Sequence, residues 1–244
     1  MLRKVHGAIR RINRSIEVLF CPRRNFIYPA EIYSHHRVSF SQEGEDLVLL
    51  ELLKNKQTGF YVDIGAYHPQ RFSNTYLFYL MGWHGINIDA MPGSMQLFNK
   101  LRPRDINLEN PISNTQEKLV YFIFHEAALN TFSQPLALKR HREHNYRLRD
   151  KTFLKTVTLA SVLDRCLPDG QVIDFLNIDV EGWDYQVLLS NDWEKYRPKF
   201  LLVEDLRTSL TPVIEPSAIQ EFLSKQGYQL VARTSRTLFF HMNS

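Results

Sequence analysis

The sequence FYVDIG occupies residues 60–65, and GINID occupies residues 85–89. Both runs are short and mostly apolar, and each ends at a glycine or an acid. Runs of this kind are typical of strands that are buried on both faces, as in parallel sheets. The two segments therefore predict strands of a parallel sheet, and they place Asp63, Gly65 and Asp89 at the carboxyl ends of those strands.

Helix-like and strand-like segments alternate along the rest of the chain. Apolar residues at helical spacing predict helices that begin near residues 45, 73 and 95, and further helices over residues 183–189 and 216–225. Ser41 is expected to cap the first helix, and the second is expected to turn Tyr76, Leu77, Leu80 and Met81 inward. Further strands are expected at residues 106–108, 119–124, 172–179 and 200–204, with a closing hairpin of residues 228–233 and 237–241. This alternation predicts a doubly wound α/β domain with a ligand site beyond the carboxyl ends of the strands.

Charge is distributed unevenly along the chain. Residues 1–24 carry a formal charge of +6, whereas the whole chain carries +4, so the remaining residues carry −2. The body of the chain lacks the basic surface on which nucleic-acid binding depends, and we expect no nucleic-acid partner. Two cysteines are too few for a disulfide framework, and no apolar run reaches the length of a membrane span. We therefore expect a cytoplasmic protein.

The first 20 residues carry an amphipathic pattern of their own. Their apolar residues recur at steps of three and four, and these are Leu2, Val5, Ile9, Ile12, Ile16 and Leu19. Such a stripe fits docking against protein, either the chain's own domain or a second copy in a homodimer. It also fits a helix that lies at the inner membrane surface as a peripheral contact. Residues 1–37 are expected to form a basic arm outside a domain of residues 38–244.

The spacing of the strand-end residues predicts a nucleoside site. Asp89 follows Gly65 by 24 residues, and an acid about 20 residues beyond a glycine turn can accept both ribose hydroxyls of a nucleoside. The alternative is that Asp63 and Asp89 merely cap neighbouring helices. The turn is not GxGxxG and no GxxxxGK[ST] motif is present, which disfavours NAD and a P-loop nucleotide. An acid at Asp63 suits the cationic end of S-adenosylmethionine better than a pyrophosphate.

Three segments together resemble the FkbM family of S-adenosylmethionine-dependent methyltransferases. They are residues 60–67, residues 85–89, and Leu176-Asn177-Ile178-Asp179-Val180-Glu181-Gly182-Trp183. Shorter matches lie at residues 41–46, 72–75, 158–159, 200–204, 227–228 and 238–240, so that the resemblance covers residues 38–241 in order. It implies the Rossmann-like class I methyltransferase fold, a mainly parallel seven-stranded sheet with a C-terminal antiparallel hairpin.

The resemblance also implies which residues hold the cofactor. The turn beside the methionine part would be formed by Asp63, Gly65 and Ala66. Asp89, followed by Ala90, would take the ribose hydroxyls. Ile112 and Ser113 would lie near the adenine, and Asp179 and Glu181 near the transferred methyl group. The chain departs from the family pattern at Tyr67-His68-Pro69, where methyltransferases often have further glycines.

Methyl transfer to a hydroxyl needs a group that accepts the hydroxyl proton. Asp179, His68 and Glu181 are the candidate catalytic bases, and Asp179 and His68 are favoured because each is expected to face the cleft at the strand ends. The alternative for His68 is a hydrogen-bonded loop histidine. The alternative for Glu181 is an acid in the first turn of the helix that follows.

A metal site is a further expectation at the same strand ends. Asp179 ends one strand, and Glu204 and Asp205 end the strand expected beside it. Three carboxylates in this arrangement can hold Mg²⁺ and orient a diol. The alternative is that Glu204 alone contacts substrate or caps a helix.

Substrate contacts are expected from Gln42, Asn74, Arg140, Arg142 and Glu204. The two arginines belong to a basic run, residues 139–151, which is expected to be a lid or substrate loop for an anionic saccharide or, alternatively, a solvated helix face. The expected reaction is O-methylation of a sugar or another polyhydroxylated metabolite. The alternatives are N- or carboxyl-methylation of a small acidic metabolite, and a non-catalytic membrane-surface or scaffold protein that retains the fold.

Overall fold

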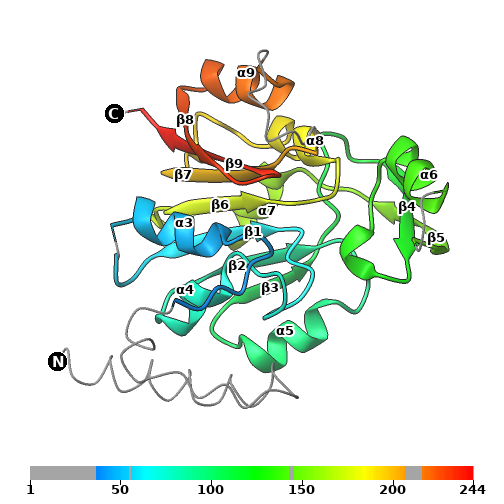
Figure 1. The fold of residues 1–244 in the computed structure, drawn as a ribbon, viewed down its shortest axis with the longest axis horizontal. Coiled ribbons are helices and arrows are strands. Elements are labelled where there is room, and N and C mark those ends of the chain that lie inside the picture. The colour runs from blue at the N-terminus through cyan, green and yellow to red at the C-terminus, as the bar shows by residue number, and fades with distance from the viewer. Residues whose placement is uncertain (1–36, 55, 143–145, 207–215, 244) are drawn as a thin grey trace. The chain divides into compact units, whose positions relative to one another are not determined.

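A computed structural model describes residues 37–54, 56–142, 146–206 and 216–243. Its main sheet has seven strands (Figure 1), which in spatial order are β3 Ile106–Glu109, β2 His84–Asp89, β1 Phe60–Ile64, β6 Phe175–Ile178, β7 Phe200–Glu204, β9 Thr237–Met242 and β8 Tyr228–Arg233. Neighbours from β3 to β7 are parallel, and β9 and β8 are antiparallel. The predicted doubly wound, seven-stranded sheet with a C-terminal hairpin is therefore confirmed.

Helices cover both faces of this sheet, and they are α3 Glu45–Leu52, α4 Tyr76–Leu80, α5 Met95–Leu101, α7 Leu159–Cys166, α8 Asp184–Leu189 and α9 Ala218–Lys225. All five residues of β1 are buried. Phe60, Val62 and Ile64 pack with residues of α7, α8 and α9, whereas Tyr61 packs with residues of α3 and α4. This alternation of side chains along β1 divides the hydrophobic core between the two faces.

A second sheet of two antiparallel strands, β4 Lys118–Phe124 and β5 Leu148–Lys155, lies beyond the carboxyl ends of the parallel strands. Between these strands the chain forms the short 3₁₀-helix η1 Ala127–Leu129 and then α6 Gln134–Arg142. Figure 1 shows β4, β5 and α6 together at its right-hand side. The predicted strand at residues 119–124 corresponds to β4.

Three local predictions are corrected by the structure. A single loop over residues 139–151 is wrong, because the described residues there end α6 and begin β5, whose Leu148 and Leu154 pack against buried aromatic clusters. The strand expected at residues 172–179 is shorter, since Val172 is 53% exposed. The inward face of α4 consists of Phe78 and Tyr79, whereas Leu80 is 36% exposed.

The expected N-cap of the first helix is also corrected. Gly44 occupies that position with φ 86°, while the Ser41 hydroxyl accepts a hydrogen bond from the Asp46 N–H at 3.3 Å. The predictions for the arm of residues 1–37, including a homodimer or membrane contact through residues 1–20, fall almost wholly outside the described residues. In the described part of the chain, no helix combines the length and the apolar composition that crossing a bilayer requires.

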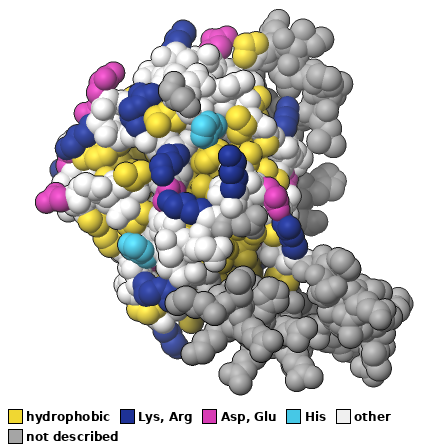
Figure 2. Space-filling model, turned by 90° about the vertical axis from the view of Figure 1, so that its left-hand side faces the viewer, with side chains coloured by type: hydrophobic (Ala, Val, Ile, Leu, Met, Phe, Trp, Pro, Cys, Tyr) yellow, Lys and Arg dark blue, Asp and Glu magenta, His cyan; other side chains and the backbone are white. Residues whose placement is uncertain are grey.

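The two ends of the parallel sheet differ in the side chains that they present. Figure 2 shows the left-hand side of Figure 1, near which the C-terminus lies and where the parallel strands begin. Lys and Arg side chains are spread there among hydrophobic ones, and acidic side chains are sparse. The strand-end acids gather instead at the opposite, carboxyl end of the sheet, where the parallel strands stop.

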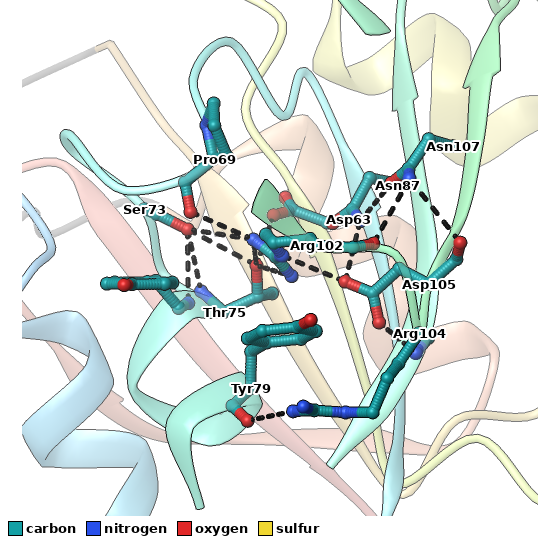
Figure 3. Close-up of polar contacts among 12 residues, drawn as sticks. Asp63, Pro69, Ser73, Thr75, Tyr79, Asn87, Arg102, Arg104, Asp105 and Asn107 are labelled. Atoms are coloured by element: carbon teal, nitrogen blue, oxygen red, sulfur yellow. Dashed lines mark hydrogen bonds and ion pairs between the residues drawn. The ribbon is translucent and has the colours of Figure 1, made fainter. Parts of the chain in front are cut away.

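Arg102, directly after α5, lies at the centre of a buried polar network (Figure 3). Its side chain is fully buried and forms an ion pair with Asp105, with Nε 2.8 Å from Oδ2. The guanidinium also donates to the Tyr61 hydroxyl at 2.7 Å and to Thr75 Oγ1 at 3.0 Å. Because Tyr61 lies on β1 and the other two partners directly precede α4 and β3, a single cation connects three parts of the domain.

Asp63 joins the same network from β1. Its carboxylate accepts hydrogen bonds from Thr75 Oγ1 at 2.7 Å and from Asn177 Nδ2 at 2.9 Å. Burial raises the pKa of Asp63, while these two bonds and the charge of Arg102 act in the opposite direction. The carboxylate thereby ties the end of β1 to β6 and to the start of α4.

The Arg102 network predicts a large stability effect. Replacing Arg102→Met removes the cation and leaves Asp105 buried without its charge partner, which costs about 3–5 kcal/mol of unfolding free energy. Equilibrium unfolding in urea measures this loss directly. The matched control is Arg165→Met, since Arg165 is exposed and donates one hydrogen bond to the Ser161 carbonyl. A midpoint for Arg102→Met equal to that of the control would contradict the central role of this network.

Candidate functional site

A cleft lies at the carboxyl ends of β1, β2 and β6, and its unfilled volume, counted to the open mouth, is about 490 Å³. Residues after these three strands form one side of it, and β4, η1 and the segment after η1 contribute the other. The residues that line the cleft include Gly65, Tyr67, Asp89, Ile112, Tyr121, Asp179 and Glu181. The cleft is therefore at the sheet edge where the sequence predicts a ligand.

Gly65 allows the ends of three strands to meet. Its φ is +83°, and a Cβ atom at this position would lie 1.7 Å from the carbonyl oxygen of Asp179. The N–H groups of Gly65 and Ala66 both donate to the Ile88 carbonyl, at 2.9 and 3.1 Å. Only a glycine permits this approach between the turn after β1 and the end of β6.

Asp89 presents a nearly buried carboxylate to the cleft. Oδ1 accepts a hydrogen bond from the Met91 N–H at 2.7 Å, and Oδ2 accepts one from the Tyr67 N–H at 2.9 Å. Burial raises the pKa of this carboxyl, and the two backbone bonds oppose that increase. Each oxygen retains capacity for a further hydrogen bond, so Asp89 can accept from a diol.

Three acids gather at the carboxyl ends of β6 and β7, and two of them, Asp179 and Glu181, line the cleft. One carboxylate oxygen each of Asp179, Glu181 and Glu204 lies within 4.8 Å of the others. Burial, together with the charges of Glu181 and Asp184, raises the pKa of Asp179 well above its usual range. Burial and the charge of Asp179 likewise raise the pKa of Glu204. These carboxyl groups therefore hold protons more readily than exposed acids do.

The loop between β6 and α8 holds two of these acids in place. Glu181 has φ 54° and Gly182 has φ 80°, which reverses the chain directly after β6. Asp184 accepts hydrogen bonds from the N–H groups of Val180 and Gly182, both at 3.0 Å. Burial is the main cause that raises the pKa of Asp184 to about 7. The backbone turn and the hydrogen bonds to Asp184 thus fix the conformation of the loop that carries Glu181 directly after Asp179.

Arg140 interacts with this loop. It is buried, forms an ion pair with Glu181, and donates to the Leu129 carbonyl at 2.9 Å. Arg142 is exposed at the end of α6, and Gln42 is exposed before α3. Asn74 is buried and donates to Asn177. None of these four lines the cleft, so their roles as substrate contacts stay predictions.

The other predicted site residues divide into two groups. Those that line the cleft are Gly65, Asp89, Ala90, Ile112, Asp179 and Glu181. Those that do not line it are Asp63, Ala66, His68, Ser113, Glu204 and Asp205. His68 Nδ1 accepts from the N–H groups of Gln70 and Arg71, as expected of a hydrogen-bonded loop histidine. Of the predicted metal trio, Asp179 and Glu204 come together, but Glu181 replaces Asp205 in the cluster.

Sequence reasoning missed the residues that cover the cleft. Tyr121, Asn130 and Phe132 lie on or after β4, and Tyr67 has φ 52° in the turn after β1. The Tyr67 hydroxyl donates to Glu126 at 2.9 Å, which links that turn to η1. Residues 119–124 are all apolar, so the sequence offers no alternation that would mark Tyr121 as facing the cleft.

Comparison with known proteins agrees with this geometry. Residues 63–230 match the family described as the methyltransferase FkbM domain, and this span exceeds half of the chain. No individual curated protein matches the chain significantly. The matched span contains Gly65, Asp89, Asp179 and Glu204, which surround the strand ends described above. The chain therefore belongs to the FkbM methyltransferase family.

Proposed function

We propose that the chain transfers a methyl group from S-adenosylmethionine to a hydroxyl of a sugar or another polyhydroxylated metabolite. Membership of the FkbM family identifies the chain as a methyltransferase. One observation carries the finer proposal: the carboxylates of Asp89 and Asp179 line a single cleft from the ends of β2 and β6. One of them suits a ribose, and the other suits a reacting hydroxyl.

The residues around the cleft fit a nucleoside with a cationic group. Asp89 keeps acceptor capacity for the ribose diol beyond its two backbone bonds. Ile88, Ile112 and Phe132 supply apolar surface for an aromatic base. The glycine at position 65 lets the ligand approach the backbone where a Cβ would collide with Asp179. S-adenosylmethionine supplies an activated methyl group on a sulfonium when it is bound.

Asp179 is the residue that we assign as proton acceptor. It lines the cleft, whereas His68 does not. Glu181 is held by Arg140 and is thereby less available for the proton. Positioning of the acceptor against the activated methyl group contributes the rest of the acceleration.

The class of methyl acceptor that we propose rests on the basic side chains near the cleft. Arg142 at the end of α6, Arg147 just before β5, and Arg149 and Lys151 on β5 are exposed, next to the elements that cover the cleft. Such side chains suit a phosphorylated or nucleotide-linked saccharide. We keep residues 1–20 as the proposed element for a homodimer or a peripheral contact with the inner membrane surface, and we propose a cytoplasmic location for the domain.

Cofactor binding tests the role of Asp89. Isothermal titration with S-adenosylhomocysteine is expected to show binding to the wild type and an about tenfold weaker affinity for Asp89→Asn, because a charge-assisted hydrogen bond is lost. The matched control is Glu109→Gln, since Glu109 pairs with Asp89 in the sheet but is exposed on β3. Absence of binding to the wild type would overturn the proposed function, and equal affinity of Asp89→Asn would overturn the ribose role.

Turnover tests the role of Asp179. With a panel of nucleotide sugars and hexose phosphates, Asp179→Asn is expected to lower S-adenosylhomocysteine release about 100-fold or more, because the proton acceptor is removed. Its affinity for S-adenosylhomocysteine is expected to stay near that of the wild type. Asp169→Asn, at an exposed acid after α7, is the control. A product that loses its methyl group in mild base would instead indicate carboxyl methylation.

A further inference from the structure

One carboxylate oxygen of Glu204, Oε2, is buried without a hydrogen-bond partner among the described residues. The residue is 5% exposed, and Oε2 has no donor within reach among the residues that the structure describes. Leaving a buried carboxylate oxygen unpaired is costly, because its solvation by water is lost and nothing replaces it. The neighbours of this carboxylate are the acids Asp179 and Glu181, and one oxygen of each of the three residues lies within 4.8 Å of the others.

The nearby cations, Arg140 and Arg236, compensate for this concentration of acid only in part. Arg140 forms its ion pair with Glu181 and uses its other terminal nitrogen on the Leu129 carbonyl. Arg236 forms its ion pair with Glu43, at 2.9 Å between Nε and Oε1. Asp184 and Glu45 add further negative charge that acts on Asp179. The cluster therefore presents converging carboxylate oxygens and an electrostatic potential that favours a cation.

We propose that Asp179, Glu181 and Glu204 bind one hard divalent cation, Mg²⁺ or Mn²⁺. Carboxylate oxygens are the ligands that these ions prefer, and three protein oxygens leave coordination positions for water or for a substrate hydroxyl. Glu204 Oε2 has no hydrogen-bond donor in the part of the chain that the structure describes, whereas Glu181 also contacts Arg140. Because each carboxylate needs to supply one oxygen only, the second oxygen of Asp179 stays available for a proton.

A role for the cation in catalysis rests on the proposed function. Asp179 and Glu181 line the cleft, so a cation that they bind would lie at its wall. A hydroxyl bound to a divalent cation loses its proton more easily, and a vicinal diol can be oriented by two contacts to one ion. The site would therefore favour an acceptor with neighbouring hydroxyls over one with an isolated hydroxyl.

Metal binding tests the site without reference to activity. Mn²⁺ is titrated into the full-length protein, and bound ion is measured by electron paramagnetic resonance and by calorimetry, with K⁺ at matched ionic strength as the reference. The wild type is expected to bind one Mn²⁺ saturably and to release it to Mg²⁺. Glu204→Gln is expected to weaken Mn²⁺ about tenfold or more, because a charged ligand becomes neutral. Asp205→Asn, at the neighbouring acid outside the cluster, is expected to leave the affinity nearly unchanged.

Titration of S-adenosylhomocysteine into the same samples separates the two proposals. Glu204→Gln is expected to bind it like the wild type, which also shows that this variant folds. If the wild type binds S-adenosylhomocysteine but no Mn²⁺, or if Glu204→Gln binds Mn²⁺ as tightly as the wild type, the metal site is wrong and the proposed methyl transfer is unaffected. If Asp205→Asn loses Mn²⁺ to the same extent as Glu204→Gln, the assignment of the three ligands is wrong.

Discussion

The guanidinium of Arg102 holds the buried acceptors that fix the turn after β1. Thr75 accepts from Arg102 and donates to Asp63, so the position of Asp63 depends on a cation that is 39 residues farther along the chain. Asp63 in turn binds Asn177 of β6. Since all these groups are buried, each needs the others in order to be satisfied. The network therefore sets the positions of β1 and β6 just before the two strands reach the cleft.

The turn at Gly65 brings the ends of β1, β2 and β6 together at the cleft. Two residues after Asp63 the chain turns at φ +83°, in contact with the carbonyl of Asp179. The adjacent N–H groups of Gly65 and Ala66 bind the carbonyl of Ile88, one residue before Asp89. The carboxylates of Asp89 and Asp179 thus come to the same cleft because their strands are both packed against one glycine turn. A side chain at position 65 would separate β1 from β6 and disturb that arrangement.

The sequence predicts the sheet and the strand-end acids because these depend on local pattern. The runs around Val62, Ile88 and Ile178 are apolar on both faces, and such periodicity is visible without tertiary information. The partners of buried polar groups are not visible in this way. Nothing local marks Arg102 as buried, or indicates that Arg140 reaches Glu181 from α6. The prediction of Asp205 beside Asp179 fails for a related reason, because adjacent residues of an extended segment point to opposite sides, and Glu204 takes the inward position.

The two ends of the cleft differ in how their acids are satisfied. At Asp89, backbone N–H groups donate to both oxygens and oppose the increase in pKa that burial causes. At Asp179 and Glu204, burial and mutual repulsion raise the pKa, and among the described residues no donor reaches Glu204 Oε2. A carboxylate that only binds a diol is stabilised by hydrogen bonds from the backbone. A carboxylate that exchanges protons or ligands needs an oxygen that accepts no hydrogen bond from the protein. This contrast is the reason to assign recognition to the end of β2, and chemistry to the ends of β6 and β7.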